Sequence, residues 1–179
     1  MIVCLINVLT ISRIFLAIAI FLLLSINNNY IFALTLFILA GVSDYFDGAL
    51  ARKYNATTQL GEVLDPIADK ILIIFLFFGL AINLSSYLIG FVASIIIARE
   101  MWVSALRDLN ARNNNTEATK VIYIGKIKTF IQLFTITIYL LGLAFSKMLL
   151  IIIADILLII ALIVTLYSGY IYTINTFKN

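Results

Sequence analysis

The sequence predicts an all-α polytopic membrane protein with six transmembrane helices. Of its 179 residues, 64% are hydrophobic and only 12% are charged, and the mean hydropathy is +1.14. A soluble domain of this length needs far more polar surface. The apolar residues also run in segments of about 20, the length at which a helix crosses the hydrocarbon core of a bilayer.

Short polar breaks separate the predicted helices. The helices cover residues 5–25, 30–52, 60–82, 87–109, 124–145 and 148–173. Several breaks, such as 25–29, 83–86 and 146–147, are rich in Asn and Ser, which favour turns. The chain contains no internal repeat, heptad pattern or soluble segment, so we expect residues 1–179 to form a single membrane domain.

The first predicted helix is expected to be retained rather than cleaved as a signal peptide. Arg13 lies in its middle, no basic stretch precedes it, and no small-x-small cleavage site follows it. The lone cysteine, Cys4, excludes an internal disulfide.

Positive charge orients the chain in the membrane. The connections after the second and fourth helices, with the adjoining helix ends, contain Arg52, Lys53, Arg107, Arg112, Lys120, Lys126 and Lys128, whereas the opposite connections contain only Lys147. The positive-inside rule therefore places both termini in the cytoplasm, as for a bacterial inner-membrane protein. The net charge of +3 comes without a basic tract, so we expect no nucleic-acid partner.

Four aspartates interrupt the second and third apolar segments. They are Asp44, Asp47, Asp65 and Asp69. A carboxylate within such a segment costs roughly 2.5–3.5 kcal/mol on insertion scales, so these residues are functional candidates. The first pair is spaced i, i+3 and the second i, i+4, which puts each pair on one helix face.

Glycines accompany the carboxylates. Gly48 follows Asp44 by one turn, and Gly61 precedes Asp65 by one turn. Because consecutive helices with a short connection are antiparallel, the two acidic faces are expected to lie opposite each other. The glycines leave room there for a ligand to approach the backbone.

Four facing carboxylates resist ionising together, and hard divalent cations remove that conflict. With oxygen ligands and no histidine in the chain, Mg²⁺ or Mn²⁺ is favoured over zinc, and two ions could clamp a pyrophosphate. Two alternatives remain. One is an ion-pair network using Arg52, Lys53 and Lys70. The other is a cation transporter, which predicts broken helices and an inverted repeat.

The complete pattern resembles the signature of the CDP-alcohol phosphotransferase family, D-x-x-D-G-x-x-A-R-x8-G-x3-D-x3-D, at every fixed position. The resemblance covers nearly the entire chain and implies that family's six-helix bundle. Three further stretches, 7–13, 98–107 and 125–132, are similar to the branch of the family that uses sn-glycerol 3-phosphate as acceptor.

The resemblance implies transfer of a phosphatidyl group from CDP-diacylglycerol to sn-glycerol 3-phosphate, giving phosphatidylglycerophosphate and CMP. Inositol phosphate, serine or phosphatidylglycerol are the alternative acceptors. It implies metal ligation by Asp44, Asp47, Asp65 and Asp69, with Asp69 also the general base, and a homodimer. The residues expected to bind the CDP-lipid are Asn7, Thr10, Gly48, Ala51, Arg52 and Gly61.

Cationic side chains are expected to hold the phosphate of the acceptor. The candidates are Arg13, Arg99, Arg107, Lys126 and Lys128. Arg13 and Arg99 are favoured because they lie within apolar helices, although either could pair with Glu100 or an aspartate instead. The alternative for Lys126 and Lys128 is anchoring at the membrane surface. Asp155, in the sixth helix, is expected to be structural or to lie at a helix contact.

Overall fold

The computed structural model describes residues 2–54, 59–113 and 123–178, and every regular element in these ranges is helical. Each predicted span coincides with one long helix, to within a few residues at each end. The elements are α1 (Ile2–Leu22), continued by the π-helix η1 (Leu23–Asn27), then α2 (Tyr30–Tyr54), α3 (Gln59–Asn83), α4 (Tyr87–Arg112), α6 (Tyr123–Ala144) and α7 (Met148–Phe177).

Four helical segments of the described chain are long and apolar enough to cross a membrane. They are Val8–Asn27, Tyr87–Arg112, Ile127–Ala144 and Met148–Phe177. The described side chains of α2 end at Asp44, after the apolar stretch Tyr30–Asp44, and α3 contains Asp65, Asp69 and Lys70 in its first half.

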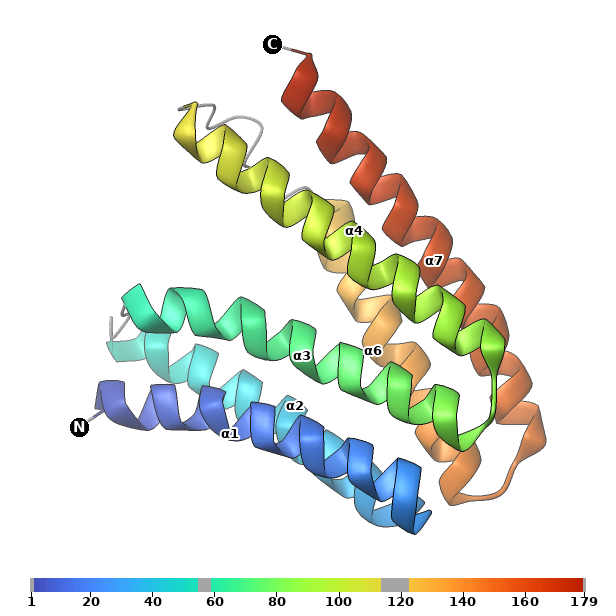
Figure 1. Ribbon diagram of the computed structural model, residues 1–179. Coiled ribbons are helices and arrows are strands. Elements are labelled where there is room, and N and C mark those ends of the chain that lie inside the picture. Colours follow the sequence, from blue (N-terminus) through green and yellow to red (C-terminus); the bar gives the residue numbers. More distant parts are fainter. Residues whose placement is uncertain (1, 55–58, 114–122, 179) are drawn as a thin grey trace.

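The helices pack in two groups. The first contains α1, α2 and α3, and the second contains α4, α6 and α7; α3 contacts α4 and α6, and α2 contacts α6. Figure 1 shows α3 and α4 diverging from their shared turn toward their opposite ends. The backbones of α3 and α4 are therefore farthest apart at the end remote from this turn, which we call the open end of the bundle.

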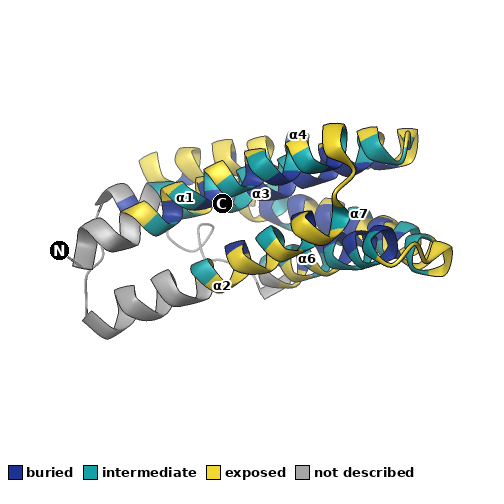
Figure 2. Cartoon of the chain, turned by 90° about the horizontal axis from the view of Figure 1, so that it is seen from below, coloured by how far each residue is buried: buried dark blue, intermediate teal, exposed yellow. Residues whose placement is uncertain are grey.

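One face of α1 is buried over its described side chains, and the same face continues into η1. The buried residues recur every three or four positions, as expected for one face of a helix: Thr10, Arg13, Ala17 and Ile20 in α1 and Leu24 in η1. The opposite face exposes large apolar side chains, including Val8, Ile11, Phe15 and Ile18, which suits contact with lipid. Figure 2 shows the same division between inward and outward faces on the other helices. Two polar residues of α1 are therefore directed into the bundle.

Three tight turns close one end of the bundle. Asn28, Ser85 and Ser146 have positive φ angles of 50°, 48° and 51°, the left-handed conformation that commonly ends a helix. At the second and third turns the following N–H reaches back into the helix, from Ser86 to the Ala81 carbonyl at 3.0 Å and from Lys147 to the Gly142 carbonyl at 2.8 Å. All three turns lie at the same end of the bundle (Figure 1).

A hydrogen bond between Tyr139 and Asp155 joins α6 to α7 in the half of the bundle closed by these turns. The Tyr139 hydroxyl donates to Asp155 Oδ1 at 2.5 Å. The tyrosine is fully buried, so the aspartate satisfies a hydroxyl that has no water to bond. The helix-contact role expected for Asp155 is confirmed.

Candidate active site

The inward face of α1 gathers the described aspartates at the open end of the bundle. Thr10 Oγ1 donates to Asp65 Oδ1 at 2.7 Å. Arg13 Nη1 donates to Asp69 Oδ1 at 2.5 Å and lies 2.8 Å from Asp44 Oδ1. We call these five residues the aspartate cluster. One turn of α1 thus brings together carboxylates from α2 and α3.

Burial within the aspartate cluster is uneven. The Arg13 side chain is 1% exposed, whereas those of Asp44 and Asp69 are 53% and 46% exposed. Two half-exposed carboxylates therefore converge on the same nitrogen of one buried cation. A carboxylate pair that already shares a positive charge is a plausible place for a second cation to bind from the solvent side.

The donor set of this cluster fits a hard divalent cation, because it consists of carboxylate oxygens on facing helices. Among the residues with described side chains, no three acidic, histidine or cysteine groups converge closely enough to hold a metal ion. The side chain of Asp47, the fourth expected ligand, lies outside the described residues. Two expected ligands, Asp44 and Asp69, therefore meet at Arg13, and the third, Asp65, accepts a hydrogen bond from Thr10.

The residues expected to bind the CDP-lipid are described in part. Thr10 contacts Asp65, and Gly61 is buried near the start of α3. The side chains of Asn7, Gly48, Ala51 and Arg52 lie outside the described residues. The two described members both lie at the end of the bundle that carries the aspartates.

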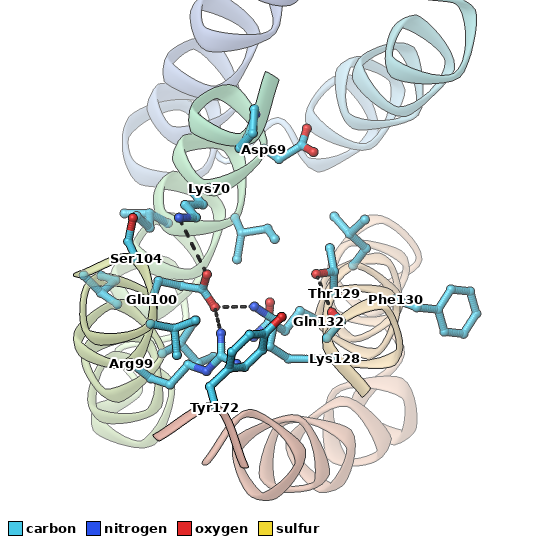
Figure 3. A pocket seen from close by; sticks show the side chains of 18 of the residues that line it. Asp69, Lys70, Arg99, Glu100, Ser104, Lys128, Thr129, Phe130, Gln132 and Tyr172 are labelled. Carbon is cyan, nitrogen blue, oxygen red and sulfur yellow. Dashed lines mark hydrogen bonds and ion pairs between the residues drawn. The ribbon is translucent and has the colours of Figure 1, made fainter. Parts of the chain in front are cut away.

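A cavity of about 490 Å³ lies between α3, α4, α6 and α7 (Figure 3). Its polar lining consists of Asp69, Lys70, Arg99, Glu100, Ser104, Arg107, Lys128, Thr129, Gln132 and Tyr172. Isoleucines of α3 and α4 form much of the remaining wall. Because Asp69 belongs to both the lining and the aspartate cluster, the cavity and the cluster adjoin.

One carboxylate in this cavity is surrounded by cations from three helices. Glu100 Oε1 accepts from Arg99 Nη1 at 2.9 Å and from Lys128 Nζ, and Glu100 Oε2 lies 3.9 Å from Lys70 Nζ. We call these four residues the Glu100 cluster. Arg99 and Lys128 are buried, so their charges depend on this carboxylate for neutralisation.

Helix α7 holds the arginines of α4. Arg99 Nη2 donates to Ser168 Oγ at 2.7 Å, and Arg107 Nη2 donates to the Tyr172 hydroxyl at 2.9 Å. A Cβ atom at Gly169 would lie 3.1 Å from Arg99 Cγ, so the glycine makes room for the arginine stem. The guanidinium groups are thereby fixed at the cavity wall.

The five cations expected to bind the acceptor do not all lie in one place. Arg99, Arg107 and Lys128 line one cavity. Arg13 does not line it, because the inward face of α1 directs its guanidinium to Asp44 and Asp69. This is the alternative pairing that the sequence left open, and Arg99 likewise pairs with Glu100 while it lines the cavity. The side chain of Lys126 lies outside the described residues.

Sequence reasoning missed Glu100 and Lys70 as members of the site. The signal for Glu100 was a second charge beside Arg99 within an apolar helix, and the signal for Lys70 was its place directly after Asp69. Neither feature of the sequence predicts which neighbouring helix the side chain of Glu100 or Lys70 faces. Only the packing of α3, α4 and α6 brings the two together.

Comparison with known proteins identifies the family of the chain. The family model for CDP-alcohol phosphatidyltransferase matches residues 3–167. Proteins named CDP-diacylglycerol–glycerol-3-phosphate 3-phosphatidyltransferase are 38% identical in Rickettsia typhi, with 93% of both chains covered, and 38% identical in Rickettsia felis, with 93% of this chain and 91% of that protein covered. A protein of that name in Escherichia coli is 39% identical over 56% of both chains. The chain belongs to the CDP-alcohol phosphatidyltransferase family.

Proposed function

We propose that this integral membrane protein transfers a phosphatidyl group from CDP-diacylglycerol to sn-glycerol 3-phosphate, giving phosphatidylglycerophosphate and CMP. The relatives named for this reaction share 38% identity over 93% of the chain. The observation that carries the proposal is a cavity rich in cations whose wall includes Asp69. Such a cavity suits an anionic acceptor presented to the aspartate cluster.

Side chains of the cavity bind and orient the acceptor. Arg99 and Lys128 are buried donors, and Arg107 lies beside them on the lining. A guanidinium matches the geometry of a phosphate, and charge-assisted hydrogen bonds are the stronger class. With its phosphate held there, the acceptor's free hydroxyl can point toward Asp69.

Asp69 is the proposed general base. Its carboxylate takes the proton of the acceptor hydroxyl while that oxygen attacks the phosphorus that bears the diacylglycerol. A new P–O bond forms to the acceptor, and the P–O bond to CMP breaks. The position of Asp69 on the wall shared by cluster and cavity is the geometric support for this role.

We also propose that Mg²⁺ or Mn²⁺, as two ions, binds Asp44, Asp47, Asp65 and Asp69. When bound, these ions supply positive charge that stabilises the attacking and leaving oxygens. Arg13 then shares or yields the oxygens of Asp44 and Asp69 that it contacts. Thr10 keeps Asp65 oriented through its hydroxyl.

We also propose how the protein lies in the membrane and how it assembles. All six long helices span a bacterial inner membrane, both termini and the open end of the bundle face the cytoplasm, residues 1–179 form one domain, and the protein is a homodimer. Support for the orientation comes from the excess of Lys and Arg in the connections at that end. Labelling of single cysteines placed at residues 28, 85 and 146 from the periplasmic side tests it.

The reaction is tested with CDP-diacylglycerol labelled in its phosphatidyl group and four acceptors in parallel: glycerol 3-phosphate, inositol phosphate, serine and phosphatidylglycerol. We expect labelled product and CMP with glycerol 3-phosphate and a divalent ion, and loss of both with EDTA. Neutral glycerol is the control acceptor. Equal reaction with glycerol, or a preference for another acceptor, would contradict the proposal.

A further inference from the structure

Glu100 is an acid in a cavity that we propose binds an anion, and its presence there calls for an explanation. Its side chain is 16% exposed, and it contacts cations of α3, α4 and α6 (Figure 3). Simple anion binding would be stronger without it, since a carboxylate competes with the ligand for the same donors. The carboxylate must therefore contribute something other than affinity.

In the protein without ligand, Glu100 neutralises buried positive charge. Arg99 and Lys128 are buried, and buried charges of one sign require a partner close by. Glu100 Oε1 serves both of them, through Arg99 Nη1 at 2.9 Å and through Lys128 Nζ. The carboxylate thereby keeps both side chains charged and gathered on one side of the cavity.

Glu100 also lowers the net charge of the Glu100 cluster. Three cations and one carboxylate leave two positive charges. A phosphomonoester carries about −1.5 to −2 charges at pH 7, whereas a phosphodiester carries one. A dianion neutralises the cluster, while a monoanion leaves an uncompensated charge in a wall that is largely apolar.

The cluster also has a cation that is easily released. Lys70 Nζ lies 3.9 Å from Glu100 Oε2, and its side chain is 37% exposed, whereas the two contacts on Oε1 are short. An arriving phosphate can therefore engage Lys70 first. Arg99 and Lys128 can then be shared between the ligand and Glu100 without any cation leaving the cavity.

We propose that Glu100 is a specificity-determining residue: it sets the net charge of the Glu100 cluster to the value that a phosphomonoester dianion neutralises, and thereby sets how strongly the dianion is preferred to a monoanion. The inference rests on the proposed function of the cavity and goes beyond it. It assigns the discrimination to an acidic side chain rather than to the cations that hold the ligand.

Anion binding to the detergent-solubilised protein, followed by thermal unfolding in EDTA without CDP-lipid, tests this inference. The probes are glycerol 3-phosphate and its monoanionic methyl diester. We expect the wild type to prefer the monoester. Glu100→Gln should bind both probes more tightly, the monoester by about tenfold, the size of one charge-assisted contact, and the monoester should gain more than the diester because its two charges meet the added positive charge.

Lys70→Gln makes the test independent of whether Glu100→Gln folds. It removes the half-exposed cation and lowers the cluster charge by one, so it should weaken monoester binding and reduce selectivity. The double variant Glu100→Gln/Lys70→Gln returns the cluster to its original charge and should restore the preference of the wild type. Asp108→Asn on α4 is the matched control, because its carboxylate forms an exposed ion pair with Arg112.

Two results would overturn the inference. One is unchanged or weaker monoester binding by Glu100→Gln, and the other is a double variant that fails to restore selectivity. Either result leaves the proposed reaction standing if the wild type still transfers phosphatidyl groups to glycerol 3-phosphate. A wild type that binds neither probe would overturn both the inference and the assignment of the cavity.

Discussion

The aspartate cluster and the Glu100 cluster are electrostatic opposites. In the first, one arginine lies between carboxylates of α2 and α3. In the second, one carboxylate lies among cations of α3, α4 and α6. Each cluster contains a single charge of the minority sign and a surplus of the other. The surplus is negative where we propose divalent cations and positive where we propose a phosphate.

The clusters differ in which member is buried. Arg13 is 1% exposed while its carboxylate partners are about half exposed, so the ligand-binding groups face outward. In the Glu100 cluster Arg99 and Lys128 are themselves buried, and only Lys70 is substantially exposed. The carboxylates can therefore exchange partners readily, whereas the cations are fixed in place. This contrast suits an exchangeable metal on one side and a site of defined shape on the other.

Removing a carboxylate from the aspartate cluster is expected to have the largest effect. Asp44→Ala and Asp65→Ala each delete a proposed metal ligand, so transfer should fall to background and stabilisation by Mn²⁺ should weaken. Asp47→Ala should behave in the same way. Activity assays and thermal unfolding with and without Mn²⁺ measure both effects, with Asp108→Ala as the control. Wild-type affinity for Mn²⁺ in these variants would argue against the metal site.

Asp69→Asn separates the two proposed roles of its carboxylate. The amide keeps the shape and one oxygen but cannot take a proton at neutral pH, so the rate should fall by about 10²–10⁴-fold. Binding of CDP-diacylglycerol, measured by equilibrium dialysis, should persist. Substantial turnover would leave Asp69 as a ligand only.

Arg99→Ala removes one of the cations of the Glu100 cluster. Loss of a charge-assisted contact costs about 1.5–3 kcal/mol, so the KM for glycerol 3-phosphate should rise by about one to two orders of magnitude. Lys126→Ala should act in the same direction if its side chain reaches the acceptor. The KM for CDP-diacylglycerol should barely change, and Arg112→Ala, an exposed arginine on the same helix, should change neither. An unaltered acceptor KM in Arg99→Ala would remove this arginine from the site.

Arg13→Gln removes the single positive charge of the aspartate cluster. Breaking a buried ion pair costs about 3–5 kcal/mol, but the half-exposed carboxylates are partly solvated, which reduces the expected loss to about 1–2 kcal/mol. The variant should therefore unfold at lower temperature in EDTA and gain more stability from Mn²⁺ than the wild type does. Equal stabilisation of both proteins by Mn²⁺ would show that Arg13 and the metal do not share oxygens.

Tyr139→Phe provides the smallest effect and a reference for both clusters. The pair of Tyr139 with Asp155 joins α6 to α7 but lines neither the cavity nor the aspartate cluster. Hydrogen bonds between membrane helices contribute about 0.6 kcal/mol on average, so we expect a small drop in unfolding temperature and unchanged transfer activity. A large loss of activity would show that this pair is coupled to the site.

The positions of the helices were predictable because their cause is local. Runs of about 20 apolar residues and Asn- or Ser-rich breaks gave each long helix to within a few residues. The acidic motif was equally accessible, since carboxylates in apolar segments stand out and their spacing places them on one helix face. The sequence predicted six membrane spans, and four helical segments of the described chain are long and apolar enough to cross a membrane.

The partners of the buried charges were decided only by the tertiary structure. Arg13 and Arg99 looked alike in the sequence, each a cation within an apolar helix, and both were expected to bind the acceptor. The inward face of α1 directs Arg13 to Asp44 and Asp69, whereas the packing of α3, α4, α6 and α7 places Arg99 on the cavity wall and brings Lys70 and Lys128 to its neighbour Glu100. Helical periodicity fixes which face of its own helix a residue occupies, but the neighbour on that face depends on how helices pack across the bundle.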